Sequence, residues 1–446
     1  MTAAPPRRQA AAVPFATLAL GISLASWTAP RPAHANGAFP DSFGVLLPAD
    51  RPDEILMATN FGMVASEDGG KTWTWACEQD AAALANIYQL GPPPLDRLFA
   101  LSSNGLVFSD DGTCGWTLAG GSAKTALVTD YFADPRDPMH VLAVALPNTT
   151  NAEAEGIYAS HDGGVTFGDP LYKAPIQGGL TGIEIARADP HIVYAAMYES
   201  PGIHPRILHS GDGGLTWDAP IDIEADIGQS SFRIIAVDPE NPQKLYLRVQ
   251  EPLQESLAIS EDGGKTFKKP ITFPIRMTAF ARLASGTVLV AGFQFDLQGF
   301  QTPLAYRSSD GGKTFGPWNT PSLRGLAERG GKLYAAADNT SDPFAVGVST
   351  DEGLTFNRLM KFSDVARIKD CAQATCAKSC TTLSMQKLWS ASICQAPMPT
   401  PMPMPMPPKT GCALAPDRSA PGAAVLALAI AVATVTAVRS RRRRRR

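Results

Sequence analysis

The stretch SEDGGKTW at residues 66–73 decides the fold, because the chain repeats it along most of its length. The shared pattern is Ser-x-Asp-Gly-Gly-x-Thr followed by Trp or Phe. A degraded copy, SDDGTCGW at 109–116, keeps the serine, the aspartate and the first glycine. The other copies begin at Ser160, Ser210, Ser260, Ser308 and Ser349.

Each copy contains the residue types that a tight turn between two strands requires. The aspartate carboxylate can accept hydrogen bonds from backbone N–H groups, and the glycines adopt positive φ without a Cβ clash. The aromatic residue gives the outgoing strand a large apolar side chain to bury. We therefore expect turns between paired strands at the seven aspartates, which are Asp68, Asp111, Asp162, Asp212, Asp262, Asp310 and Asp351.

The spacing of the copies predicts the architecture. They begin at residues 66, 109, 160, 210, 260, 308 and 349. A period of about 40–50 residues with short strands is typical of a β-propeller, in which each blade is a small sheet. The sequence thus predicts an all-β, seven-bladed propeller over 36–367 with one copy per blade. Unrelated hairpins in another all-β fold are the alternative, and the sequence leaves open how the ring closes.

The residues between the copies fit four-stranded blades. In the fourth blade, 182–186, 191–197 and 206–209 have the composition of its first three strands. The dipeptide Asp189-Pro190 predicts a turn between the first two of these strands. The same dipeptide recurs at Asp134-Pro135 and Asp238-Pro239, a little over twenty residues before a copy.

The repeat resembles the Asp-box, or BNR repeat, of sialidases, sortilin-type receptors and photosystem II assembly factors, and we call each copy an Asp-box. The resemblance implies a sialidase-like or sortilin-like propeller. In sialidases it also implies an early Phe-Arg-Ile-Pro motif and an arginine cluster that binds the substrate carboxylate. This chain has only FRII at 232–235, on the expected inner strand of the fifth blade, where it is explained as structure. Arginines at expected inner-strand positions look few, so we predict no catalytic residues.

The bulk composition excludes some functions. The 446 residues carry 18% charged side chains and a formal net charge of −3, so there is no general footprint of a nucleic-acid-binding protein. The six histidines have no metal-ligand spacing, and we expect neither a metal site nor a cofactor.

The N-terminus has the three parts of a secretory signal peptide. Arg7-Arg8 precedes an apolar stretch at 10–27, and Ala33-His34-Ala35 follows. We predict a signal peptide over 1–35 with cleavage after Ala35. A retained membrane anchor is the alternative.

Export permits disulfide bonds. Cys77 follows the first Asp-box and Cys114 lies in the second, on neighbouring blades, so we predict a Cys77–Cys114 disulfide; two free buried thiols are the alternative. A small Cys-rich segment over 368–395 has spacings that differ from the Cys-x2-Cys pairs of zinc sites. We favour two disulfides within it, with connectivity open, among Cys371, Cys376, Cys380 and Cys394.

The C-terminal region has the composition of a targeting signal. Residues 396–411 are rich in Pro and Met, which predicts an extended polyproline II linker. In 412–446, Cys412 precedes an apolar run at 422–438 and six arginines at 441–446. This run is just long enough for a transmembrane helix, with the arginines on the cytoplasmic side.

This layout resembles the MYXO-CTERM sorting signal of myxobacterial surface proteins. The resemblance implies cleavage near Cys412 by a sorting protease and display on the cell surface. A permanent single-pass anchor is the alternative.

We therefore expect an exported, surface-displayed propeller that acts as a non-enzymatic binding, adhesion or scaffold module. Its partners are an unidentified protein or glycan, the export machinery, a sorting protease and, through the C-terminal helix, the membrane. A sialidase-like glycoside hydrolase and an assembly protein of the photosystem II type are the alternative functions.

Overall fold

The computed structural model describes residues 41–78, 83–147, 155–175, 178–274, 276–297 and 301–395. The predicted signal peptide with Ala35, the linker at 396–411, Cys412 and the apolar run at 422–438 lie outside these residues. Among the helices that the model does describe, none is long and apolar enough to span a membrane.

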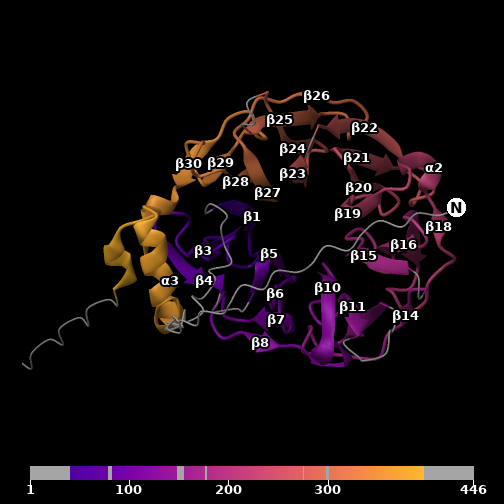
Figure 1. Cartoon of the computed structure of the whole chain (residues 1–446), viewed down its shortest axis with the longest axis horizontal. Helices are drawn as coiled ribbons and strands as arrows, with labels where there is room; N and C mark the ends of the chain where they lie inside the picture. Colours follow the sequence, from indigo (N-terminus) through magenta and orange to yellow (C-terminus); the bar gives the residue numbers. More distant parts are fainter. Residues whose placement is uncertain are drawn as a thin grey trace, which may run out of the picture. The chain divides into compact units, whose positions relative to one another are not determined.

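Seven antiparallel sheets follow one another around a ring (Figure 1). The first blade contains β1 (Ser42–Leu46), β2 (Ile55–Thr59), β3 (Gly62–Ser66) and β4 (Trp73–Cys77), and the second β5 (Ala83–Leu90), β6 (Leu98–Ser102), β7 (Gly105–Ser109) and β8 (Thr117–Leu118). The third contains β10 (Ala126–Ala133), β11 (Val141–Pro147), β12 (Gly156–Ser160) and β14 (Tyr172–Lys173), and the fourth β15 (Gly178–Ile185), β16 (Val193–Glu199), β17 (His204–Ser210) and β18 (Ile221–Asp222).

The remaining blades repeat this order. The fifth contains β19 (Ser231–Val237), β20 (Leu245–Glu251), β21 (Gln254–Ser260) and β22 (Lys268–Phe273). The sixth contains β23 (Arg276–Arg282), β24 (Val288–Phe295), β25 (Gln301–Ser308) and β26 (Gly316–Pro317), and the seventh β27 (Leu323–Arg329), β28 (Lys332–Ala337), β29 (Val346–Ser349) and β30 (Asn357–Met360). The prediction of an all-β, seven-bladed propeller is confirmed.

Each Asp-box connects the third and fourth strands of its blade, and its serine and aspartate hold the turn. In the sixth blade, Ser308 Oγ donates to Asp310 Oδ1 over 2.6 Å and accepts the Gly312 N–H over 2.8 Å. Asp310 accepts the backbone N–H of Thr314 at 2.9 Å and its hydroxyl at 2.5 Å. Gly311 and Gly312 adopt φ of +74° and +91°, which explains the two glycines of the pattern.

The first strand of each blade lies next to the ring axis (Figure 1) and has an irregular register with the second strand. In the third blade the irregularity lies between Val128 and Asp130, and in the fourth between Leu180 and Gly182. A β-bulge bends a strand and redirects its side chains. The inner strands therefore carry side chains whose direction a strict alternation does not predict.

Apolar clusters fill the space between neighbouring sheets. Tyr246 and Leu257 of the fifth blade pack with Met277, Val288 and Val290 of the sixth, and all five are buried. Burial of apolar surface contributes about 25 cal/mol per Å², so these interfaces between blades stabilise the ring.

The ring closes through the residues that follow the seventh blade. β31 (Val365–Ile368) pairs in parallel with β4, which gives the first blade a fifth strand. Helix α3 (Gln373–Met385) follows and contributes the buried Cys376 and Cys380 to the same apolar cluster as Trp75 of the first blade. The Cys-rich segment thus shares the core of the first blade.

The disulfides differ from the predicted pairs. Cys77 binds Cys376 and Cys114 binds Cys371, with Cα–Cα distances of 5.4 and 5.9 Å, so the predicted Cys77–Cys114 bond is wrong. Only Cys380–Cys394 lies within the segment, so the prediction of two disulfides there is also wrong. The physical reason is the return of the chain along β4, which brings Cys371 and Cys376 to the first two blades.

Candidate functional site

Two carboxyl groups lie on neighbouring inner strands, Asp130 on β10 and Glu184 on β15. Asp130 Oδ2 accepts the backbone N–H of Ile183 over 3.0 Å, which joins the third blade to the fourth. Burial raises the pKa of Asp130 to about 6, although the charge of Arg233 acts in the opposite direction. Burial, together with the charge of Asp130, raises the pKa of Glu184 well above its ordinary value. Both carboxyl groups are therefore expected to stay protonated to a higher pH than ordinary carboxyl groups.

The inner strands of the last three blades carry five arginines, so the expectation that such arginines are few is wrong. Three of them join blades. Arg282 Nε lies 3.0 Å from Asp238, and Arg324 Nε lies 2.9 Å from Asp41. Arg329 donates to four backbone carbonyls of the first blade, including that of Glu54 at 2.8 Å. These side chains have structural roles.

The other two, Arg233 and Arg276, are exposed on the neighbouring strands β19 and β23. Arg233 belongs to the FRII stretch, whose predicted position on the inner strand of the fifth blade is correct. Arg233 is exposed, and its charge acts to lower the pKa of Asp130. We call Asp130, Glu184, Arg233 and Arg276 the axial set.

The axial set combines two kinds of chemistry. A carboxyl group whose pKa is raised can donate a hydrogen bond or a proton near neutral pH. An exposed guanidinium presents several N–H donors to a carboxylate, phosphate or sugar hydroxyl. The set therefore suits recognition of a polar ligand, and its carboxyl pair has the residue types of an acid–base pair.

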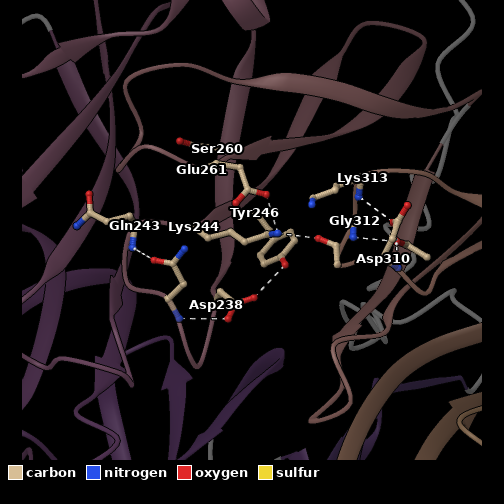
Figure 2. A network of polar contacts seen from close by, with 12 residues as sticks. Asp238, Gln243, Lys244, Tyr246, Ser260, Glu261, Asp310, Gly312 and Lys313 are labelled. Carbon is tan, nitrogen blue, oxygen red and sulfur yellow. Dashed lines mark hydrogen bonds and ion pairs between the residues drawn. The ribbon is translucent and has the colours of Figure 1, made fainter.

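A second group of polar contacts joins neighbouring blades on the side of the Asp-boxes. In Figure 2, Lys244 of the fifth blade contacts Glu261 of its own Asp-box at 2.7 Å and donates to the carbonyl of Gly311, in the next blade, over 2.6 Å. In the same group of contacts, the Tyr246 hydroxyl donates to the buried Asp238 over 3.1 Å. We call this arrangement an inter-blade joint.

Two other joints repeat the arrangement. Arg97 of the second blade contacts Asp110 of its own Asp-box at 2.6 Å and donates to the Gly163 carbonyl of the third blade. Between the first two blades the cation is Lys369 from the C-terminal segment, which donates to the Gly112 carbonyl over 2.7 Å and lies 3.2 Å from Glu67. No feature of the Asp-box pattern predicts these cations, because they lie outside the eight residues.

A pocket of about 430 Å³ lies at the joint between the first two blades and is lined by carboxylates, including Glu54, Glu67 and Asp110. Each of these three has a cationic partner: Arg51, Lys369 and Arg97, respectively. Three of the five carboxylates that line the pocket are thus paired with cations, and Asp53 and Asp111 are the other two.

The seven predicted Asp-box aspartates lie in separate turns, one per blade, and the structure does not bring them together. Hydrogen bonds from Thr72 lower the pKa of Asp68 to about 2, and those from Thr216 lower the pKa of Asp212 to about 2. Both carboxylates serve the local turn. Throughout the described ranges, no group of three or more His, Cys, Asp or Glu side chains has the arrangement of a metal site.

No protein-family model matches the chain, and no curated protein matches its sequence. Among solved structures, an ancestral GH74 enzyme is similar with 13% identity and a TM-score of 0.41 over 72% of this chain, which spans about half of that enzyme (54%). YCF48 from Cyanidioschyzon merolae matches 66% of this chain and 92% of its own length, with 16% identity and a TM-score of 0.45.

The Hadza microbial sialidase Hz136 matches 64% of this chain and 71% of its own, with 14% identity and a TM-score of 0.39. Identities and TM-scores at this level give no support to any particular activity.

Proposed function

We propose that the protein is an exported, surface-displayed binding module that recognises a protein or glycan through the axial set, without catalysing a reaction. The observation that carries this proposal is the pair of exposed arginines: Arg233 on β19, the inner strand after that of Glu184, and Arg276 on β23, the next inner strand. Other arginines of the inner strands are used in contacts between blades, whereas these two extend charge toward solvent.

The covalent closure of the ring supports this role. Three disulfides favour an oxidising compartment outside the cytoplasm. A ring closed by disulfides and inter-blade joints holds the axial side chains on strands, and a rigid site loses less entropy when it binds a ligand. Display on the cell surface rests on the predicted signal peptide and sorting tail.

A glycoside hydrolase is the second candidate, and the raised pKa values of Asp130 and Glu184 favour it. Glycosidases use two carboxyl groups, one of which is protonated near neutral pH. Asp130, however, already accepts an inter-blade hydrogen bond from Ile183, which suits a positioned structural acceptor.

The test mixes the purified full chain with surface polysaccharide and envelope proteins of its host. We expect retention of an intact ligand by the wild type and at least about tenfold weaker retention by Arg233→Ala/Arg276→Ala, since each lost charged hydrogen bond is worth about 1.5–3 kcal/mol. Lys313→Ala, an exposed cation in the sixth Asp-box, is the matched control.

Equal retention by the double variant would exclude the axial arginines. Shortened polysaccharide would contradict a non-enzymatic role, and loss of that activity in Glu184→Gln would assign it to the carboxyl pair.

A further inference from the structure

The inter-blade joints differ in their residues, and not all of them contain a cation, since Ile192 and Thr287 take the position of Lys244 in the fourth and sixth blades. Between the third and fourth blades, His140 takes the position of Lys244, because their backbone carbonyls accept the equivalent bonds, from the N–H groups of Asp134 and Asp238. His161 takes the position of Glu261 in its Asp-box. Three described joints combine a cation with a carboxylate, whereas this one combines two imidazoles.

The His140 ring lies close to the equivalent glycine of the next Asp-box, as Arg97 and Lys244 do. A Cβ added to Gly163 would lie 3.0 Å from Arg97 Nη1, and one added to Gly311 would lie 3.8 Å from Lys244 Nζ. One added to Gly213, the equivalent glycine of the fourth blade, would lie 4.0 Å from His140 Cε1.

The two imidazoles lie together and one of them is held by a carboxylate. Their ring centroids are 5.5 Å apart, and the planes differ by 6°. His140 Nδ1 lies 3.1 Å from Oδ2 of the buried Asp134, and both side chains are shielded from solvent, with exposed fractions of 12% and 6%. A carboxylate on one ring nitrogen orients a histidine and makes its other nitrogen a better ligand.

We propose that His140 and His161 form a binding site for a borderline divalent transition cation such as Zn²⁺, which takes the place of the Lys or Arg of the three joints that combine a cation with a carboxylate. His140 Nε2 and one ring nitrogen of His161 are the protein ligands, and water completes the coordination. Asp134 is a positioning residue that fixes the His140 ring.

The separation of the rings suits this role. Zinc lies about 2.0–2.1 Å from a ligating nitrogen and thus about 3.2 Å from the ring centroid, so a tetrahedral angle places two ligating rings about 5 Å apart. The observed 5.5 Å is close to that value, but the two rings are stacked, so one ring has to turn before both nitrogens point at one ion. His161 is exposed, so its ring can rotate about the Cβ–Cγ bond until its nitrogen points at the ion.

The adjoining pocket gives the ion access from solvent. It has a volume of about 510 Å³ and is lined by His161 together with Asp162, Thr166 and Asp169. Since Asp162 is already bonded to Thr166 and Ser160 within its Asp-box, His161 is the residue of this wall that we assign as a ligand.

The test is calorimetric titration of the full chain with Zn²⁺ at pH 7.5, after treatment with EDTA, in four forms: wild type, His161→Gln, His140→Gln and His209→Gln. His209 is the matched control, because it is a histidine of the fourth blade with its own carboxylate partner, Asp218, at 2.6 Å. Every form keeps Cys412, so any binding there is the same in all.

We expect a site whose affinity falls at least about tenfold in His161→Gln and in His140→Gln and stays unchanged in His209→Gln. The wild-type affinity should also fall at pH 5.5, since protons compete for the imidazoles.

Failure of the wild type to bind, an unchanged affinity in His161→Gln, or an equal loss in His209→Gln would overturn the proposal. His161 is exposed, so His161→Gln decides the question even if His140→Gln fails to fold.

Discussion

The second and sixth Asp-boxes occupy equivalent turns but are held in different ways. The sixth keeps all of its local bonds, because Ser308, Asp310 and Thr314 bond to one another within eight residues, although its Gly311 carbonyl also accepts a bond from Lys244. The second has Gly115 in place of that threonine and Thr113 in place of the second glycine. Thr113 adopts φ of +99°, which is strained for a β-branched residue, and its buried Oγ1 has no hydrogen-bond partner.

Long-range contacts hold the degraded turn. Cys114 is bonded to Cys371, and Lys369 donates to the carbonyl of Gly112. Both partners come from the segment that closes the ring. The comparison teaches that a repeat can lose its local hydrogen bonds where a distant part of the chain supplies substitutes.

The largest loss of stability should follow from removal of the Cys114–Cys371 disulfide. Cys114→Ser/Cys371→Ser should lower the free energy of unfolding by about 3–5 kcal/mol, because the disulfide closes a very long loop. Urea unfolding measures the change. The control, Cys380→Ser/Cys394→Ser, removes a bond between cysteines only 14 residues apart and should cost less. An equal or larger loss in the control would contradict this account.

The second-largest loss of stability should follow from removal of the Lys369 cation. Lys369→Met removes the bond to the Gly112 carbonyl, and we expect a loss of about 1–2 kcal/mol, reduced from the usual value for a charged hydrogen bond by the exposure of Glu67. Lys244→Met at the sixth box, which keeps its local bonds, should cost less. Thermal unfolding of both variants tests the order, and the reverse order would show that the second box does not depend on Lys369.

A local bond should be critical in an intact box. Ser308→Ala leaves the buried N–H of Gly312 without its acceptor and should cost about 1–2 kcal/mol in urea unfolding. Ser309→Ala, at the exposed neighbouring position, is the control and should be nearly neutral. A neutral Ser308→Ala would mean that the turn does not rely on its serine.

The strained backbone at Thr113 predicts that a substitution there can raise the stability of the protein. Thr113→Gly should stabilise the chain by about 1 kcal/mol, since glycine accepts positive φ and removes the unpaired hydroxyl. Gly312→Thr should have the opposite effect, because a Cβ there would lie 3.0 Å from Ile259 Cδ1. A loss of stability in Thr113→Gly, measured as the melting temperature, would refute the assignment of strain.

The smallest expected effect is on the stability of the fold at low pH. The pKa of Asp212 is lowered to about 2, first by the Thr216 hydroxyl, from an ordinary value near 3.9. A carboxylate with a lowered pKa stabilises the fold above its ordinary pKa, and this contribution disappears as the pH falls through about 2. Asp212→Asn should therefore differ from wild type at pH 5 and converge with it at pH 2. A constant difference in urea midpoint would contradict this.

The sequence predicted what local chemistry determines. The Ser-x-Asp-Gly-Gly-x-Thr turns depend on residues within eight positions, so seven blades followed from the repeats alone. The cysteine pairs could not be predicted, because they depend on the pairing of β31 with β4. The strand at 365–368 is only four residues long, and its sequence does not indicate a parallel partner.

The axial set was missed for a similar reason. The sequence shows neither the burial that raises the pKa of Glu184 nor the exposure of Arg233, whose stretch also fits the alternation of a strand. The inner-strand bulges contributed to this, because they change which side chains reach the axis. His140 and His161 were recognisable only by comparison with Lys244 and Glu261 at an equivalent joint.

Native-state hydrogen exchange is the most direct test of the claim that the C-terminal segment replaces the lost bonds of the second Asp-box. Wild type and Cys114→Ser/Cys371→Ser are compared strand by strand. We predict that amides of β7 and β8 lose protection in the variant while those of β25 and β26, beside the sixth box with its intact local bonds, keep theirs. Equal loss in both blades, or no loss in β7 and β8, would contradict the account.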